Sequence, residues 1–197
     1  MPPYTTPVGA VSPGLDRVMQ VGGAEALGDV GLRVILAEYP GYGPRPGQPG
    51  EAALVRDAVA TLARVREQFP GPLLVAGESL GAGVAAAVAE KSPGDLSGLL
   101  LITPWDSLKQ VARHHYPWAP VDLLLRDRYD NIANLAGFRG PVAVVIAGQD
   151  SIVPAPFGQA LFASLPGPKR LWTIPADHND WMMQVVGNWG TAGTTFL

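Results

Sequence analysis

The sequence predicts an α/β fold: a mostly parallel central sheet flanked by helices, in a single domain of residues 1–197. Short apolar runs alternate with longer amphipathic stretches, and turns that contain glycine separate them. The runs are nearly continuous in Leu, Val, Ile and Ala, as in strands that are covered on both faces. Alternation of strands and helices is typical of a parallel sheet. The five predicted strands span residues 33–38, 73–76, 99–102, 142–147 and 171–174.

The first predicted helix spans residues 51–68. Its apolar residues Leu54, Leu62 and Val65 recur at helical spacing, and Glu51 stands in the first turn, where a negative charge stabilises the helix. Residues 82–91 form a helix of small side chains that ends before a Pro-Gly pair. Residues 157–165 and 180–186 are two further predicted helices.

Composition excludes several classes of function. Apolar residues make up 47% of the chain and charged residues 16%, a balance that favours a packed core over disorder. The net charge is −3 and Lys and Arg are scattered, so we expect neither nucleic acid nor a membrane as a partner. Without cysteine there is no disulfide, thiol nucleophile or thiolate zinc site. We find neither a signal-peptide pattern nor a spanning apolar segment, and expect a cytoplasmic protein.

Residues 77–81 read Gly-Glu-Ser-Leu-Gly, which has the form G-x-S-x-G. The pentapeptide alone is a weak signal. Its position is stronger evidence, because it follows the apolar run 73–76 and leads into the helix 82–91. A strand, a tight turn and a helix are the setting in which a nucleophilic serine projects above a parallel sheet. We interpret Ser79 as a nucleophile; the alternative is an ordinary turn with a serine N-cap.

A serine nucleophile needs a base and a group that orients the base. His178 follows the last apolar run and is the candidate base, whereas His114 and His115 suit a surface or pocket-rim position. Asp150 ends the preceding strand segment and is the candidate acid, which would hold the imidazole in the tautomer that accepts the serine proton. For Asp177 and Asp180, next to the histidine in sequence, the plainer role is solvation or helix capping.

From about residue 30 to 182 the chain resembles small, nearly lidless α/β hydrolases of the Bem46-like and serine-aminopeptidase-like groups. The matching phrases are Glu-Tyr-Pro-Gly-Tyr-Gly at 38–43, Gly-Glu-Ser-Leu-Gly-Ala-Gly at 77–83, Gln-Asp-Ser-Ile-Val-Pro at 149–154 and His-Asn-Asp at 178–180. The resemblance implies an α/β-hydrolase fold with a minimal lid and ester or thioester hydrolysis through an acyl-enzyme, without a cofactor. It places the nucleophile at Ser79, the acid at Asp150, the base at His178 and one oxyanion donor at the Leu80 N–H.

The chain departs from that family in two places. The first is a missing strand that ends in His-Gly in the family. The irregular segment 1–14 stands where this central strand belongs. The fold is therefore expected to be shortened at this end, and also at the other end, where the tail 187–197 is irregular. Residues 4–12 could fill the slot, the strands at 33–38 and 73–76 could pair directly, or a neighbouring chain could insert. The second departure is Asp177, where the family commonly has glycine. Its carboxylate would favour a charged imidazole.

We therefore expect a carboxylesterase that cleaves small, uncharged acyl esters, with no metal and no cofactor. The second oxyanion donor is expected near Gly9 or at Tyr42. Rival activities on the same three residues are acyl-thioester hydrolysis and peptide hydrolysis, the latter with Asp106 or Glu78 binding an amino terminus. A non-catalytic binding or assembly module and a homo-oligomer are also open. The residues expected to line an acyl pocket are Trp105, Tyr116, Trp118, Ile152 and Trp181, for each of which an ordinary core or rim position is the alternative.

Overall fold

The computed structural model describes residues 31–43 and 45–181, which fall into two compact units that divide between Pro49 and Gly50. The segments 1–14 and 187–197 lie outside the described residues, and with them the alternative that residues 4–12 replace the missing strand. Most of the helix expected at 180–186 lies outside them too. In the first unit a tight turn is closed by hydrogen bonds from the Tyr42 N–H to the Tyr39 carbonyl and from the Gly41 N–H to the Arg45 carbonyl, both 3.1 Å long.

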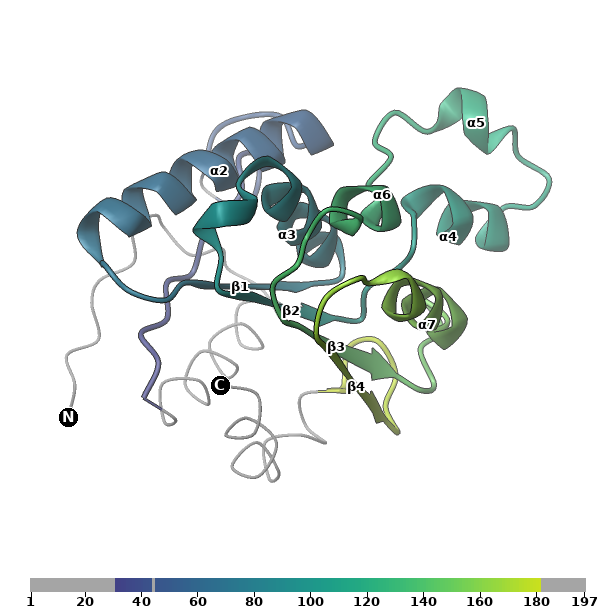
Figure 1. Cartoon of the computed structure of the whole chain (residues 1–197). Helices are drawn as coiled ribbons and strands as arrows, with labels where there is room; N and C mark the ends of the chain where they lie inside the picture. Colours follow the sequence, from purple (N-terminus) through teal and green to yellow (C-terminus); the bar gives the residue numbers. More distant parts are fainter. Residues whose placement is uncertain (1–30, 44, 182–197) are drawn as a thin grey trace. The chain divides into compact units, whose positions relative to one another are not determined.

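The second unit contains a four-stranded sheet in which every neighbouring pair is parallel, in the order β1-β2-β3-β4 (Figure 1). The strands are β1 (Leu74–Glu78), β2 (Gly98–Ile102), β3 (Val142–Ala147) and β4 (Lys169–Ile174). Sequence order and spatial order therefore coincide. Because all four strands point the same way, the loops that follow them gather at one edge of the sheet.

The register aligns the strand ends in two pairs. Glu78 at the end of β1 pairs with Ile102 at the end of β2, and Ala147 at the end of β3 pairs with Ile174 at the end of β4. Because Ile102 pairs with Val145, β3 extends two residues beyond the end of β2. The residues that follow β1, β3 and β4 thus start from the same edge of the sheet, those after β3 and β4 from adjacent strands. This edge is where we look for the candidate site.

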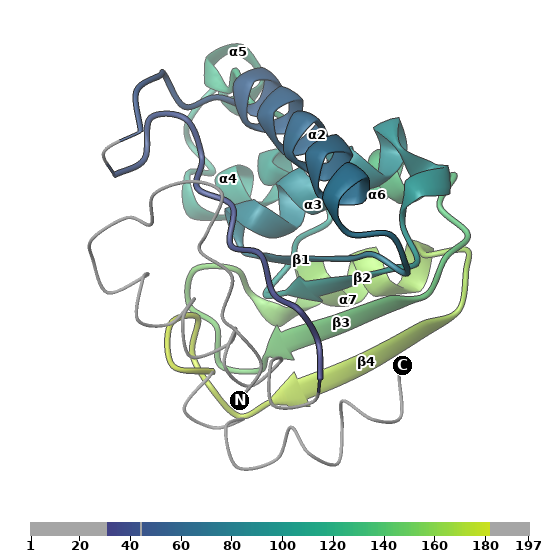
Figure 2. The same cartoon turned by 90° about the vertical axis from the view of Figure 1, so that its left-hand side faces the viewer.

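Helices connect the strands. In both views α2, α3 and α6 lie on one face of the sheet (Figure 1, Figure 2), and α7 packs against β3. Within the described residues no helix is long and apolar enough to cross a bilayer. The helices are α2 (Glu51–Gln68), α3 (Leu80–Lys91), the 3₁₀ turn η1 (Pro93–Asp95), α4 (Leu108–His115), α5 (Val121–Leu124), α6 (Asn131–Leu135) and α7 (Ala155–Ser164).

The core is centred on β2, β3 and α3. All six residues of β3 are buried, as the continuous apolar run predicts for an interior strand. Residues Ala82 to Ala89 of α3 are also buried, and their small side chains let the helix approach β1 and β2 closely. At Gly83 an added Cβ would lie 2.8 Å from the Tyr129 ring, so the close packing of this ring requires glycine.

The α/β fold class is confirmed, and four of the five predicted strands are present. The predicted helix 51–68 has the same bounds as α2. The strand expected at 33–38 is wrong, because these residues form no ladder and a strand exists only through its hydrogen-bonded partner. Within the second unit β1 pairs with β2 alone. Residues 33–38 belong to the first unit, so their direct pairing with 73–76 stays an open alternative. The short helices α4, α5 and α6 were not predicted.

Burial predicts how leucine substitutions will act in this unit. Leu101 on β2 is 0% exposed and Leu123 on α5 is 85% exposed. We expect Leu101→Ala to lower the free energy of unfolding by about 2–5 kcal/mol, because it removes buried methyl groups and leaves a cavity. Leu123→Ala, the matched control, should change it by less than about 0.5 kcal/mol. Urea unfolding of both variants measures this, and equal losses would contradict the described core.

Candidate active site

Ser79 lies at the junction of β1 and α3, as the N-cap residue of the helix. Its backbone has φ 50° and ψ −116°, a conformation that residues other than glycine rarely adopt. Its N–H donates to the carbonyl of Ile102 at the end of β2, 2.9 Å away, which fixes the turn to the sheet. A serine kept in a strained turn on a rigid sheet is consistent with a functional position.

The first glycine of the pentapeptide is required by the close approach of the backbone. A Cβ built on Gly77 would lie 2.2 Å from the carbonyl oxygen of Gly81 and 2.7 Å from the Ala82 nitrogen. These are backbone atoms, so no side-chain rotation could relieve the overlap. The turn can close only with glycine at position 77, which explains this part of the motif.

Asp150 follows β3 and its carboxylate is enclosed, with 1% of the side chain exposed. Oδ1 accepts hydrogen bonds from the N–H groups of Ile152 at 2.9 Å and Val153 at 2.6 Å. Oδ2 lies 2.7 Å from Nδ1 of His178. The loop after β3 therefore wraps its own N–H groups around one oxygen and leaves the other for the histidine.

His178 follows β4 and connects the other two side chains. Its Nε2 lies 3.0 Å from the Ser79 Oγ, and its side chain is 8% exposed. With Asp150 as a carboxylate that only accepts, Nδ1 must carry the proton and Nε2 is left as the acceptor for the serine hydroxyl. The structure thus brings Ser79, His178 and Asp150 into one hydrogen-bonded line.

Asp177 joins the loop that carries the histidine to the loop that carries the acid. Its Oδ1 accepts from the N–H of Ser151 at 2.9 Å, from the Ser151 hydroxyl at 3.0 Å and from the N–H of His178 at 2.7 Å. The Asp180 carboxylate accepts from the Asp177 N–H at 2.6 Å. The hydrogen bond from the Ser151 N–H, with smaller contributions from the His178 N–H and the Ser151 hydroxyl, lowers the pKa of Asp177 below its usual 3.8.

Leu80 is the first residue of α3, and first-turn N–H groups have no acceptor within their own helix. The Leu80 N–H immediately follows Ser79, which suits the predicted oxyanion position. Gly9 lies outside the described residues, and Tyr42 belongs to the other compact unit, where its ring stacks edge-on against Tyr39 at 6.0 Å. The second oxyanion donor stays a prediction.

The five predicted pocket residues differ in burial. Trp105 and Trp181 are 3% and 2% exposed, whereas Tyr116, Trp118 and Ile152 are exposed. Trp181 donates its indole N–H to Glu78 Oε1 at 2.8 Å. Glu78 precedes the nucleophile candidate and Trp181 follows the histidine loop, so this bond is a second tie between parts of the site. Pocket lining by the five residues remains a prediction.

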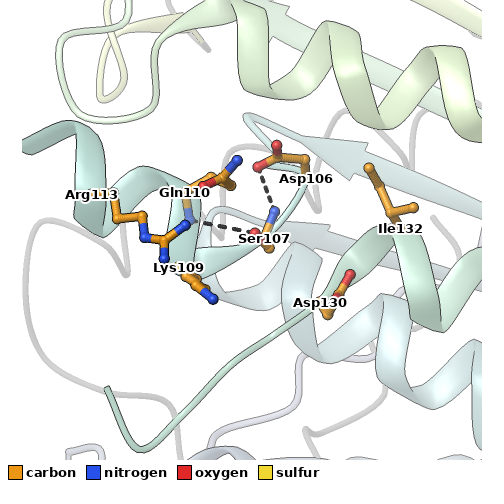
Figure 3. Close-up of a pocket in the computed structure, with 7 residues that line it drawn as sticks. All are labelled: Asp106, Ser107, Lys109, Gln110, Arg113, Asp130 and Ile132. Atoms are coloured by element: carbon orange, nitrogen blue, oxygen red, sulfur yellow. Dashed lines mark hydrogen bonds between the residues drawn. The ribbon is translucent and has the colours of Figure 1, made fainter. Parts of the chain in front are cut away.

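A depression of about 380 Å³ lies at the start of α4, and none of Ser79, Asp150 and His178 lines it (Figure 3). Burial raises the pKa of Asp106 in this depression, and the neighbouring Asp130 carboxylate adds to the rise, while the hydrogen bond from the Ser107 N–H opposes it. Among the described residues no group of three or more His, Cys, Asp or Glu side chains is arranged to hold a metal ion. The depression is lined by Asp106, Ser107, Lys109, Gln110, Arg113, Asp130 and Ile132.

Sequence reasoning missed two of these connections. Ser151 carried no signal beyond its place after Asp150, and Glu78 was considered only as a binding group for an amino terminus. Asp177 did carry a signal, because it departs from the glycine of the resembling family, but that departure suggested an effect on imidazole charge. The side chain also bonds to Ser151 in the neighbouring loop, which the sequence gave no reason to expect. The expected effect on the imidazole stays a prediction.

The family described as serine aminopeptidase, S33 matches residues 17–125, more than half of the 197 residues. The chain belongs to this family. The match includes Ser79 and ends before Asp150 and His178. The expected α/β-hydrolase membership is therefore shown, while the roles of the acid and the base depend on the geometry above.

Individual relatives support the same assignment. The uncharacterized protein Rv2307c of Mycobacterium tuberculosis H37Rv is 41% identical over 169 residues, 84% of this chain and 59% of that protein. The lysophosphatidylserine lipase ABHD12 of Danio rerio is 26% identical over 157 residues, 70% of this chain and 41% of that protein. The chain thus spans two to three fifths of the length of these relatives.

Solved structures share the fold at low sequence identity. Est1E from Butyrivibrio proteoclasticus, in a structure with bound ferulic acid, aligns with a TM-score of 0.78 over 99% of this chain and 91% of that one. The identity is 16%, so this likeness shows the fold alone. It confirms an α/β-hydrolase architecture.

The lowered pKa of Asp177 predicts a pH-dependent contribution to stability. A carboxyl whose pKa is lower in the folded state stabilises the fold above its unfolded pKa, and this contribution is lost as pH falls through the folded pKa. We expect Asp177→Asn to unfold at a lower temperature than the parent chain at neutral pH. The gap should close as pH falls below about 4. Thermal melts across that range measure it.

The control is Glu90→Gln, which removes an exposed carboxylate at the end of α3 opposite Ser79. It should change the melting temperature little at any pH. A gap for Asp177→Asn that stays constant down to strongly acidic pH would show that the carboxylate charge does not hold the two loops together.

Proposed function

We propose that the chain is a serine hydrolase, a carboxylesterase that cleaves small, uncharged acyl esters through Ser79, His178 and Asp150. The observation that carries this proposal is the hydrogen-bonded line from Ser79 Oγ to His178 Nε2 at 3.0 Å and from His178 Nδ1 to Asp150 Oδ2 at 2.7 Å. The base lies within reach of the nucleophile, and an acceptor orients the base, which is the arrangement that activates a hydroxyl.

In the proposed reaction Ser79 Oγ forms a bond to the ester carbonyl carbon while its proton moves to His178 Nε2. The negative oxygen that results accepts from the Leu80 N–H and a second donor, near Gly9 or at Tyr42. The carbonyl re-forms as the bond to the alcohol breaks, and the alcohol leaves with the proton from His178. Water then attacks the acyl-serine by the same proton path and releases the acid.

Contacts of the nearby acidic residues favour esters over peptides with free amino termini. Recognition of an ammonium group needs an available carboxylate close to the nucleophile. Glu78 lies next to Ser79, but its Oε1 already accepts from Trp181, and Asp106 lines a depression without the three proposed catalytic side chains. One relative is named a lysophosphatidylserine lipase. We therefore place esters first and keep peptide hydrolysis, which the family description names, as the second candidate.

The first functional prediction concerns the nucleophile and the base. Ser79→Ala should lower the rate of p-nitrophenyl ester hydrolysis by roughly 10³-fold or more, because no other group can form the acyl-enzyme. His178→Ala should lose a similar factor. The double variant should be no worse than either single one, since the residues act as a unit. A fluorophosphonate probe should label the parent chain and not Ser79→Ala.

Matched controls separate chemistry from folding. Ser164→Ala removes a hydroxyl on α7 that donates to the Leu161 carbonyl, and His114→Ala removes an exposed imidazole on α4. Both should retain most of the rate and the labelling. A purified Ser79→Ala that keeps more than a few per cent of the parent rate would overturn the assignment. Absence of labelling and turnover in the parent chain would favour a non-catalytic binding module.

One set of substrates tests which acyl group and which leaving group the site prefers. We expect a higher kcat/KM for p-nitrophenyl propanoate than for the p-nitrophenyl ester of alanine, which differs by one ammonium group. Burying that charge without a partner costs free energy. A preference for the alanine ester, together with turnover of alanine p-nitroanilide, would establish the peptidase instead. A propanoyl thioester cleaved faster than a matched oxygen ester would establish the thioesterase.

A further inference from the structure

Two neighbouring loops carry the proposed acid and the proposed base. Residues 148–153 follow β3 and contain Asp150, and we call them the acid loop. Residues 175–180 follow β4 and contain His178, and we call them the base loop. The strands β3 and β4 lie side by side, and both loops leave from the same end of the sheet (Figure 2). Contacts between the two loops therefore set the distance between acid and base.

Hydrogen bonds join the two loops on both sides of Asp150. On the N-terminal side of this residue, the Gln149 N–H donates to the Ala176 carbonyl at 2.9 Å. On its C-terminal side, the Ser151 N–H donates to Asp177 Oδ1 at 2.9 Å. The acid is thus flanked by two links, and both reach the residues that immediately precede the base.

The carboxylate of Asp177 makes several hydrogen bonds at once. Its Oδ1 accepts from the N–H of Ser151 and, at 2.7 Å, from the N–H of His178. The Ser151 hydroxyl lies 3.0 Å from Oδ1 and 3.1 Å from Oδ2. One side chain therefore holds the backbone of the residue after the acid and the backbone of the base together.

The imidazole of His178 has to satisfy two partners that follow different strands. Its Nδ1 lies 2.7 Å from Asp150 Oδ2, and its Nε2 lies 3.0 Å from Ser79 Oγ. These nitrogens lie on different sides of the ring, so a shift toward one partner lengthens the distance to the other. Misplacing a reacting group by about 1 Å can cost roughly 10²-fold in rate. Contacts that fix the base loop can therefore contribute to the rate.

The contacts of Asp177 favour a role in position over a role in charge. The residue is exposed, so water screens the effect of its charge on the imidazole. Its hydrogen bonds to two backbone N–H groups are short and directional. The Asp180 carboxylate supports the same geometry, because it accepts from the Asp177 N–H at 2.6 Å.

We propose that Asp177 is a positioning residue that, together with Ser151, holds the base loop in register with the acid loop, so that His178 meets both of its partners. This role rests on the proposed ester hydrolysis. Asp177 acts through the histidine and touches no reacting atom. Loss of its hydrogen bonds should therefore lower kcat for an ester and leave KM unchanged.

Steady-state kinetics with p-nitrophenyl propanoate test the proposal. Asp177→Ala should lower kcat about tenfold or more and change KM by less than about twofold. Asp177→Asn should keep kcat within about threefold of the parent value, because the amide oxygen can still accept from both backbone N–H groups. This variant can melt at a lower temperature all the same, since an amide is a weaker acceptor than a carboxylate.

Asp122→Ala is the matched control. Asp122 is also an exposed carboxylate, and its hydrogen bonds from Lys109 and Arg113 lower its pKa, but it joins α4 to α5. Its loss should leave kcat at the parent value.

Ser151→Ala tests the other member of the pair. It removes the hydroxyl and keeps the backbone N–H, so it should lower kcat less than Asp177→Ala does. The double variant should be no slower than Asp177→Ala, because the hydroxyl then has no carboxylate to bind.

Proton NMR gives a readout that needs no turnover. The Nδ1 proton that His178 donates to Asp150 should resonate far downfield in the parent chain, and His178→Ala assigns it. The resonance should persist in Asp177→Asn and should broaden or vanish in Asp177→Ala. If the parent chain neither reacts with the fluorophosphonate probe nor cleaves esters, the proposed function fails, and this resonance still decides the positioning.

Four outcomes would overturn the proposal. Asp177→Ala could keep the parent kcat and the downfield resonance. Its loss could appear in KM alone, which would indicate contact with the substrate. Asp177→Asn could lose as much kcat as Asp177→Ala, which would show that the charge matters and not the position. Asp122→Ala could lose the same factor, which would show that reduced stability alone slows the reaction.

Discussion

The parallel alignment of β1, β3 and β4 is the constraint on which the candidate site depends. The loops that follow these strands lie at the same edge of the sheet, and each carries one residue of the candidate site. Ser79 follows β1, Asp150 follows β3 and His178 follows β4. In an antiparallel sheet of the same strand order, β4 would point opposite to β1 and β3, and the loop with His178 would leave from the other edge. The register of Ala147 with Ile174 places the loops that carry Asp150 and His178 next to each other. The hydrogen bonds of the site then need only small adjustments of short loops.

The loops of the site are held in place largely by hydrogen bonds to carboxylate groups. Asp150 accepts two N–H groups of its own loop in addition to its contact with the imidazole. Asp177 binds the neighbouring Ser151, and Glu78 binds Trp181 beyond the histidine. The strained backbone of Ser79 costs free energy, which the surrounding contacts must offset. The contacts of Asp150 and Asp177 both join the loop after β3 to the loop after β4, and the contact of Glu78 joins the end of β1 to the residues after β4.

The sequence predicted the parts of this arrangement that local pattern determines. The helix 51–68 was predicted at its observed bounds because its apolar spacing and its flanking residues agree. Four strands were found because continuous apolar runs are distinctive, and their ends shifted by no more than two residues. The predicted His178 lies within hydrogen-bond distance of both the predicted Ser79 and the predicted Asp150, because the loops that carry them all leave the parallel sheet at one edge.

The local sequence pattern did not predict long-range strand pairing or the short irregular segments. Residues 33–38 have the composition of a strand, yet they form no ladder, since a partner is needed that composition does not reveal. The helices α4, α5 and α6 are four to eight residues long, too short for a helical period to stand out. The tie between Asp177 and Ser151 joins residues 26 positions apart through loop geometry alone.

The connection between β2 and β3 shows how such irregular sequence can still be positioned. It leaves the sheet at the same edge as the loops that carry Ser79, Asp150 and His178, because β2 is parallel to its neighbours. The start of this connection therefore lies near Ser79, whose N–H donates to the carbonyl of Ile102 at the end of β2. Its contact from His115 to Ile152 fixes it against the acid loop. The prolines at 117 and 120 separate α4 from α5, because proline has no backbone N–H to donate to a continuous helix. The connection therefore folds as two short helices, which a helical period in the sequence does not reveal.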